Sequence, residues 1–311
     1  MAGNAELVES RGHQYSLSVV LVVAHPDDTP TAVLKSLAAQ SGHPAFELII
    51  VDGREGAGTP DCFFGLADVK RLSRPGCNMP RLKSEGLAAS SGEIVAFLEP
   101  KGVPDQAWVT TILRCFEHSF VDALGGCVDF NAARSTANLA AFLFEYSAFG
   151  HDSIEKGLTS DLPGNNMAFR RDGFVSSCQD ILTKHGLNKP FCQSRLTERG
   201  AGIRLSSDLH IALETRHRLW PLLTSRYAFA RCFSGVRREQ ASKLKRFVLV
   251  IAAPAIPLIV MCKRVPAIRH LQGALRRPDV LLALLALSGI WALGEVTGCW
   301  FGAGQSCRKL Y

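Results

Sequence analysis

Charged side chains follow two apolar runs of this sequence, in positions where they could meet a phosphate-bearing ligand. Asp52 ends the run FELIIVD, while Glu99 and Lys101 follow the run IVAFL. Two carboxylates at such positions could hold Mg²⁺ or Mn²⁺, which prefer oxygen ligands, and another carboxylate could accept a proton. In this sequence Lys101 stands where the second of the two carboxylates would be. The pattern therefore predicts a ligand site in which basic groups share the work with few carboxylates.

The elements that would position these residues alternate along the chain. Valine-rich apolar runs are typical of buried strands, and the segments between them have helical spacing of apolar residues. Expected strands are 17–25, 46–53, 94–100 and 121–130, and expected helices are 29–40, 81–93 and 106–120. The alternation predicts an α/β domain with a mostly parallel sheet. Ligands of such sheets bind at the carboxyl ends of the strands, where Asp52 and Glu99 fall.

Five segments, in order, resemble family-2 glycosyltransferases of the GT-A fold. They are LSVVLVVAHPDDTPTAVLKSLAAQSGHPAFELIIVDG, KSEGLAASSGEIVAFLEPKGVP, LPGNNMAFRRDGF, RLTERGAGIRLSSDLHIAL and SRYAFARCFSG, and together they cover about residues 17 to 240. The resemblance implies a Rossmann-like GT-A domain with helices on both faces of its sheet. It also implies sugar transfer from a nucleotide sugar to a lipid-linked or polysaccharide acceptor in cell-envelope glycan synthesis.

The resemblance implies roles for individual residues. Asp52, Lys83, His25 and Arg195 would bind the nucleotide sugar, and Glu99 and Lys101 would act in catalysis, with Glu99 as the metal ligand if there is one. Asn165, Asn166, Met167 and Arg170 would line the donor or acceptor cavity, and Arg226 and Arg231 would meet a lipid phosphate. Simpler alternatives stay open: Asp52 as a turn residue, EPKG as a surface loop, and Arg195 as a partner of Glu198.

The sequence departs from the family pattern at its acidic positions. Lys83-Ser84 replaces an Arg-Asn pair, and Lys101 replaces the second acid of the metal motif. Asn188-Lys189 falls where an E-D pair usually includes the catalytic base. Asp180 and Glu198 are the candidates for a substitute base by elimination. These departures keep open a second interpretation, a pseudoenzyme that binds nucleotide or partners without turnover.

A lysine and a divalent ion are poor neighbours. At about 4 Å and an effective dielectric constant near 20, their repulsion amounts to several kcal/mol. Either Lys101 turns to solvent, or it pairs with the diphosphate in place of the metal. The sequence thus predicts nucleotide binding that is nearly independent of metal, while Mg²⁺ or Mn²⁺ at Glu99 remains an alternative.

The amino-acid composition limits the classes of molecule that the protein is expected to bind. The 311 residues carry a formal net charge of +7, which favours anionic partners. There is no stripe of basic and aromatic residues, so nucleic acid is not expected. The ten cysteines include no C-x-x-C pair, and we interpret them as reduced packing residues of a cytoplasmic protein. The polar N-terminus has no apolar core of a signal peptide.

The C-terminal part of the chain is apolar and flanked by basic residues. The segments 247–262 and 280–293 are candidate membrane helices, although the first is short and the second runs into Glu295. Basic residues on both flanks favour a first segment that is re-entrant or interfacial and a second that spans the bilayer or also lies at the interface. Two full spans and soluble core helices are the alternatives, and 142–150 is a further candidate lipid-facing patch.

Together these observations predict three regions: a polar tail (1–16), a GT-A glycosyltransferase-like domain (17–242) and membrane-associated helices (243–311). We expect a membrane-associated hexosyltransferase-type enzyme whose catalytic domain faces the cytoplasm, against anionic headgroups.

Overall fold

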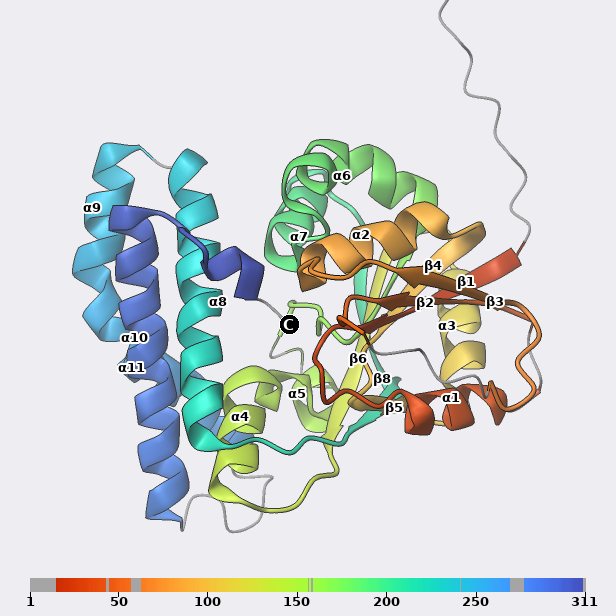
Figure 1. The fold of residues 1–311 in the computed structure, drawn as a ribbon, viewed down its shortest axis with the longest axis horizontal. Coiled ribbons are helices and arrows are strands. Elements are labelled where there is room, and N and C mark those ends of the chain that lie inside the picture. Colours follow the sequence, from red (N-terminus) through yellow and green to blue (C-terminus); the bar gives the residue numbers. More distant parts are fainter. Residues whose placement is uncertain are drawn as a thin grey trace, which may run out of the picture.

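The fold is a single eight-stranded sheet between two helical layers, with a third group of helices beside it (Figure 1). This computed structural model describes residues 15–42, 45–56, 63–155, 157, 159–240, 242–268 and 277–309. The N-terminal tail expected at 1–16 lies almost wholly outside them. The sheet order is β3-β2-β1-β4-β7-β6-β8-β5. The strands are β1 (Tyr15–Val23), β2 (Glu47–Asp52), β3 (Val69–Ser73), β4 (Gly92–Leu98), β5 (Gly102–Pro104), β6 (Ala123–Phe130), β7 (Asn166–Arg170) and β8 (Ile203–Leu213).

The sheet is mixed, so the expectation of a mostly parallel sheet is wrong. β1–β2, β2–β3, β1–β4 and β6–β8 pair in parallel, whereas β4–β7, β6–β7 and β5–β8 are antiparallel. Antiparallel neighbours need no helical crossover, so the short strands β5 and β7 can enter from connecting loops. β7 inserts between β4 and β6 and holds them in the same direction.

Helices cover both faces of the sheet. The helices of the sheet domain are α1 (Thr31–Ala38), α2 (Met79–Ala89), α3 (Trp108–Phe116), α4 (Thr136–Glu145), α5 (His151–Glu155), α6 (Arg171–His185) and α7 (Lys189–Glu198), with the 3₁₀ turn η1 (Ser147–Phe149). Alternate residues of β1 point to opposite faces, as strand geometry requires. Leu21 packs with α1 and α3 on one side, and Val20 packs with α2, α6 and α7 on the other.

The C-terminal helices form a layer beside the sheet. They are α8 (Leu219–Gln240), α9 (Lys243–Ala252), η2 (Ala253–Ala255), α10 (Ile256–Ile268), α11 (Pro278–Phe301) and η4 (Ser306–Lys309). α8 runs along α11, so the layer includes residues before 243 (Figure 1). Within the described residues, α11 alone is long and apolar enough to cross a membrane, and 39% of its apolar window is buried inside the protein.

Two sequence interpretations change at this layer. The segment 142–150, considered as lipid-facing, is buried or half-buried throughout, and Leu143 of α4 packs against Val280 and Leu284 of α11. The cysteines are not all reduced, because Cys232 of α8 forms a disulfide with Cys307 of η4 across a sequence separation of 75. Five other described cysteines are free and buried, as expected of packing residues: Cys115, Cys127, Cys178, Cys192 and Cys299.

Candidate functional site

Loops from several strands meet at one edge of the sheet. Val23 of β1 pairs with Asp52 of β2, and Leu21 of β1 pairs with Leu98 of β4, so the residues after these strands lie side by side. The ends of β6 and β8 are level with each other, because Phe130 pairs with Leu213. This shared edge therefore places the loops that begin at His25, Gly53, Glu99, Asn131 and Glu214 around one space.

Asp52 is buried and already carries a partner. The Arg54 guanidinium donates from Nε to Oδ1 at 2.9 Å and from Nη2 to Oδ2 at 2.7 Å, and the Arg54 backbone N–H donates to Oδ1 at 3.0 Å. The same guanidinium donates to the Asp28 carbonyl at 2.9 Å. Hydrogen bonding to Asp52 raises the pKa of Arg54. The pair thus clamps the loop after β1 to the end of β2.

Glu99 meets a buried ammonium group. Lys83 reaches from α2, and its Nζ lies 2.9 Å from Glu99 Oε1 and 2.7 Å from the Gly164 carbonyl. The Lys83 side chain is only 7% exposed and that of Glu99 is 26% exposed. The lysine therefore neutralises the carboxylate that the sequence suggested as a metal ligand.

Lys101 pairs with a different acid at the same edge. Its Nζ lies 3.2 Å from Oδ1 of Asp28, whose side chain is 5% exposed, while Lys101 itself is 41% exposed. The other Asp28 oxygen accepts from the His25 backbone N–H at 3.1 Å. Because the Lys101 side chain is already partly exposed, its ammonium group can exchange Asp28 for a bound anion without leaving a buried position.

Several carboxylates at this edge already have cationic partners. Among the described residues, no three His, Cys, Asp or Glu side chains gather into a group that could hold a metal ion. Glu99 and Asp28 each face a lysine, and Asp52 faces Arg54. A divalent ion here would have to displace two ammonium groups, against their electrostatic repulsion.

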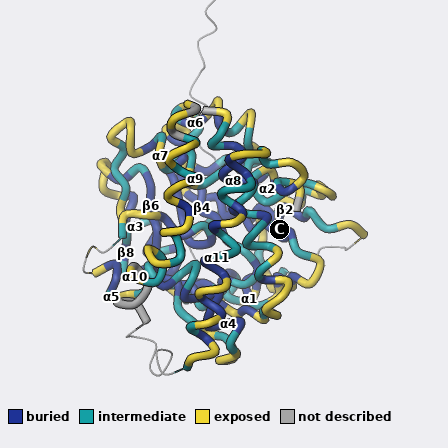
Figure 2. Tube along the Cα trace, turned by 90° about the vertical axis from the view of Figure 1, so that its left-hand side faces the viewer, coloured by how far each residue is buried: buried dark blue, intermediate teal, exposed yellow. Residues whose placement is uncertain are grey.

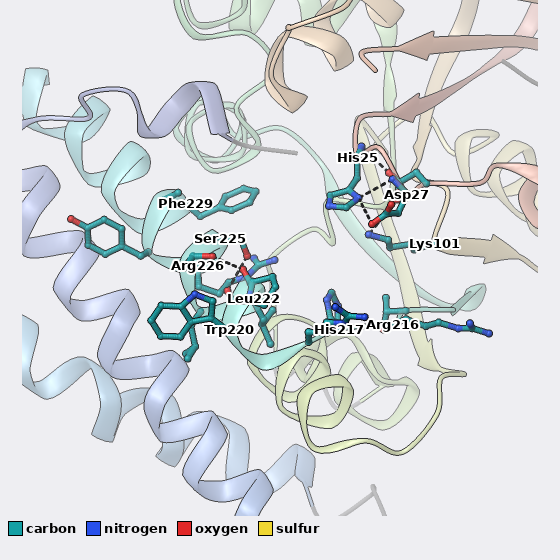
Figure 3. A pocket seen from close by; sticks show the side chains of 18 of the residues that line it. His25, Asp27, Lys101, Arg216, His217, Trp220, Leu222, Ser225, Arg226 and Phe229 are labelled. Atoms are coloured by element: carbon teal, nitrogen blue, oxygen red, sulfur yellow. Dashed lines mark hydrogen bonds and ion pairs between the residues drawn. The ribbon is translucent and has the colours of Figure 1, made fainter. Parts of the chain in front are cut away.

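A cavity of about 2020 Å³ opens from this edge toward α8 (Figure 3). His25, Asp27 and Lys101 lie on the sheet side, and Trp220, Arg226 and Phe229 lie opposite on α8. Arg216 and His217, from the loop before α8, lie below the sheet-side residues in this view, and the Arg216 side chain points away from α8. Its basic lining residues are Lys101, Arg216, Arg218, Arg226 and Arg231. Apolar lining comes from α8 and from Ile290 of α11. The cavity therefore combines positive charge with apolar surface.

His217 is a half-buried titratable group of this cavity. Burial, followed by the charges of Lys101, Arg226 and His25, lowers its pKa to about 4. Its backbone N–H donates to Asn138 Oδ1 at 2.7 Å, which fixes the loop between β8 and α8 to α4. The ring is therefore neutral near pH 7 and can accept a hydrogen bond.

The two arginines assigned to a lipid phosphate both line the cavity but have partners. Arg226 lies 2.9 Å from Glu145 of α4, and both side chains are less than 20% exposed. The Nε atom of Arg226 is nevertheless buried without a hydrogen bond. Arg231 donates from Nε to the Gly302 carbonyl at 3.3 Å.

Four predicted cavity residues belong to the interior or to its margin. Asn166 accepts from Trp108 Nε1 at 2.9 Å and donates to two backbone carbonyls, so its amide is satisfied by the core. Met167 is 1% exposed in the same strand. Arg170 binds the carbonyls of Val121, Phe116 and His118 at the opposite end of β7. Asn165 is 2% exposed, and its Oδ1 has no hydrogen-bond partner.

The structure does not bring Arg195 or the candidate bases into the cavity. Arg195 of α7 holds Asp180 of α6 through two hydrogen bonds of 2.9 and 3.0 Å, and it lies 4.0 Å from Glu198. Lys189, in the E-D position, is half-buried and donates to the Leu162 carbonyl at 2.9 Å. Burial lowers the pKa of Lys189. Its amine is therefore held by the backbone, away from the cavity lining.

Sequence reasoning missed three residues that organise this edge: Asp28, Arg54 and His217. A weak signal existed for the first two, because Asp28 lies just after the expected strand 17–25 and Arg54 directly follows the expected strand 46–53. His217 lies in the basic stretch TRHR, whose position after β8 becomes visible only when the strand order is known.

Comparison with known proteins identifies the fold. No protein-family model matches the sequence, and no curated protein matches it significantly. Among solved structures, the mannosyltransferase PcManGT from Pyrobaculum calidifontis, in complex with GDP-Man and Mn²⁺, superposes with a TM-score of 0.57 at 15% identity, over 93% of this chain and 88% of that one. Staphylococcus aureus TarS 1–349 matches at a TM-score of 0.47 and 14% identity over 91% and 90% of the two chains, and its complex with UDP gives 0.47 and 15%. The fold of this chain is thus similar to that of PcManGT, with an α/β sheet flanked by helices.

Proposed function

We propose that this chain is a glycosyltransferase-type protein that binds a nucleotide sugar in the cavity at the strand ends. The observation that carries the proposal is the basic cavity at the edge where β1, β4, β6 and β8 end. Open α/β sheets bind ligands at this edge. PcManGT, which has the similar fold, was solved with GDP-Man. A nucleotide diphosphate is the ligand that basic side chains at this edge would suit.

The size and lining of the cavity favour two substrates. Single small-molecule pockets occupy about 300–1,000 Å³, whereas this one measures about 2020 Å³. We assign the sheet side, with Lys101 and His25, to the donor. The α8 side, with Trp220, Phe229 and the arginines, suits an acceptor that has both apolar and anionic parts, such as a lipid-linked glycan precursor.

Transfer would break the bond between the sugar and the diphosphate while the acceptor hydroxyl bonds to the anomeric carbon. Lys101 can offset charge on the departing diphosphate as a point charge. The proton of the hydroxyl needs an acceptor, and the proton-accepting side chains in the cavity lining are Asp27, Asp28, Glu214, His25 and His217. Because Glu99 and Asp28 each face a lysine, we assign no step to a metal here, whereas PcManGT was solved with Mn²⁺.

A second candidate function is nucleotide binding without turnover. It is favoured by Lys189, which belongs to the Asn188-Lys189 pair that falls where the catalytic base is usually found and donates to the Leu162 carbonyl. One lysine also carries half the charge of a divalent ion, so it should bind a diphosphate better than it stabilises the leaving group. Turnover is therefore the property that separates the two candidates.

The test is a thermal-shift titration with GDP, UDP, GDP-mannose and UDP-glucose, each with Mn²⁺ and with EDTA. A ligand that binds only the native state at 100 times its Kd stabilises it by about 2.7 kcal/mol. We expect stabilisation by at least one nucleotide in EDTA, and a smaller shift at high salt. Lys101→Asp should lose the shift in EDTA and regain it with Mn²⁺. No shift with any nucleotide would contradict the proposal, and a shift abolished by EDTA would contradict metal-free binding.

A further inference from the structure

Apolar side chains are exposed on three neighbouring helices of the C-terminal layer, which lies beside the sheet domain (Figures 1 and 2). We call them the outer apolar face: Leu244, Phe247, Val248 and Ile251 of α9, Leu258 and Ile259 of α10, and Leu282, Leu285, Leu293 and Trp300 of α11. Their exposure runs from 48% for Leu285 to 73% for Leu244. The spacing on α9 is i, i+3, i+4 and i+7, which places its four residues on one side of the helix.

The side of α11 that faces the protein packs against α8, a helix with several charged residues. Glu295 of α11 forms an ion pair with Arg237 of α8, and the Glu295 carbonyl accepts from Ser234 Oγ at 2.7 Å. α8 also carries Arg226, Arg231, Arg238 and Glu239 along its 22 residues. A charged side chain at the centre of a bilayer is strongly unfavourable. α11 therefore cannot cross a membrane in this packing without drawing the charges of α8 into the hydrocarbon.

The sequence from α9 to the start of α11 is basic. Residues 240–278 contain no Asp or Glu and eight basic residues: Lys243, Lys245, Arg246, Lys263, Arg264, Arg269, Arg276 and Arg277. Apolar side chains beside a basic segment complement a bilayer surface with anionic headgroups. A protein partner would need a matching acidic and apolar surface, whereas an anionic leaflet supplies both features.

We propose that the outer apolar face docks the protein onto one leaflet of an anionic membrane, with α11 lying at the interface and not crossing the bilayer. The apolar side chains of α9, α10 and α11 enter the headgroup region, and the positive charge that the sequence carries at residues 240–278 favours an anionic leaflet. α8 and the sheet domain stay in water. This inference goes beyond the proposed function and is independent of it, because no nucleotide or acceptor takes part.

Vesicle binding tests the surface. The intact protein should co-sediment with vesicles of phosphatidylglycerol and phosphatidylcholine (1:1), and at least tenfold more weakly with phosphatidylcholine alone or in 0.5 M NaCl. Phe247→Asp combined with Ile251→Asp should weaken binding at least tenfold with an unchanged circular dichroism spectrum. Phe120→Asp, an equally exposed aromatic on the sheet domain, should bind as the unaltered protein does. Equal loss in both variants, or no vesicle binding, would overturn the proposal.

A labelling experiment separates docking from spanning. Arg134, whose carbonyl accepts from Arg277, marks the start of α11, and Gln305 lies just beyond its end. Each is replaced by Cys in a chain carrying Cys62→Ser, Cys77→Ser and Cys262→Ser, and membranes of expressing bacteria are treated with an impermeant maleimide. Both positions should react in inverted vesicles and neither in spheroplasts. Reaction from opposite sides would show a span. A soluble dimer dispersed by the Phe247→Asp and Ile251→Asp pair would show that a second copy covers the face. Either outcome overturns the proposal.

Discussion

At the scale of single residues, charge compensation dominates the site. Lys83 faces Glu99, Lys101 faces Asp28, and Arg54 faces Asp52. The three pairs differ in exposure, because Lys101 is 41% exposed while the side chains of Lys83 and Arg54 are below 10%. Lys101 is thus the pair member free to exchange a carboxylate for a ligand phosphate, and the other two pairs maintain the shape of the edge.

Removing the buried ammonium should be costly. We expect Lys83→Met to lower the free energy of unfolding by about 2 kcal/mol, because Glu99 is left partly buried without its charge partner. The matched control is Lys184→Met, whose pair with Glu239 is exposed on both sides and should contribute less than about 1 kcal/mol. Denaturant unfolding of each variant measures the difference. Adding Glu99→Gln should recover part of the loss, and equal effects of both lysine substitutions would contradict a structural role for Lys83.

His217 should make stability depend on pH. Its pKa in the folded protein is about 4, below the ordinary value of about 6.5. Between these values the unfolded chain binds a proton that the native state refuses, so stability falls as the pH is lowered from 6.5 toward 4. We expect a contribution on the order of 2 kcal/mol across this window and none above it. His217→Gln should flatten the profile, whereas the exposed His118→Gln should not. Parallel profiles for the unaltered protein and His217→Gln would contradict the burial of this ring.

The sequence predicts part of this chemistry. Strand ends identified Asp52, Glu99, Lys101 and His25, because apolar runs show where strands stop. It did not predict that Lys83 would reach Glu99, since that contact depends on how α2 packs on the sheet. It also assigned Arg170 to a cavity, whereas its carbonyl partners lie at the far end of β7. Hydrophobic periodicity predicts which strand or helix a residue belongs to. Contacts between side chains of different elements can be predicted only when the packing of those elements is known.

At the scale of elements, close backbone approach holds α8 against α11. A Cβ at Gly298 would lie 2.4 Å from the Arg231 carbonyl, and one at Gly294 would lie 2.7 Å from the Tyr227 carbonyl. Both glycines face α8 four residues apart, so neighbouring turns of α11 make the same contact. The two helices can therefore lie closer than side chains would permit.

A comparison of two glycines in the same helix tests this contact. Gly298→Ala should lower the free energy of unfolding by about 1–3 kcal/mol, because the added methyl group meets backbone that cannot move aside. Gly289→Ala has open space around its Cβ and should stabilise the helix by up to about 1 kcal/mol. Thermal unfolding of the two variants gives opposite shifts. A stabilising Gly298→Ala would mean that α8 and α11 are farther apart than described.

The sequence predicted those strands that have a strong hydrophobic pattern. The valine-rich runs gave β1, β2, β4 and β6, all of which pair within the sheet. β3 was missed because VKRLS is half polar at an edge of the sheet. β5 and β7 are three and five residues long, and no periodicity distinguishes such short strands from loops. These two strands make the sheet mixed.

At the scale of the whole molecule, the C-terminal helices are structural partners of the sheet domain. Leu139 and Leu143 of α4 pack with Val280 and Leu284 of α11, and Leu222 of α8 packs with Leu287. η4 returns to the sheet domain, where Asn78 Nδ2 donates to the Cys307 carbonyl at 2.9 Å. The helices therefore contribute both a wall of the cavity and part of the core.

Deleting residues 243–311 tests this dependence. From the sequence, a cut near 243 should release a soluble domain, but the packing predicts that it exposes Leu139, Leu143 and Leu222 and removes the partners of α8. Each newly exposed leucine forfeits about 1.5–3 kcal/mol, which is comparable with the total stability of a domain when several are combined. We expect chain 1–242 to aggregate or to unfold without a cooperative transition, as measured by size-exclusion chromatography and circular dichroism. Chain 1–301 keeps α11 and should remain folded. A monomeric 1–242 with the melting temperature of the intact protein would show that the helices form an independent unit.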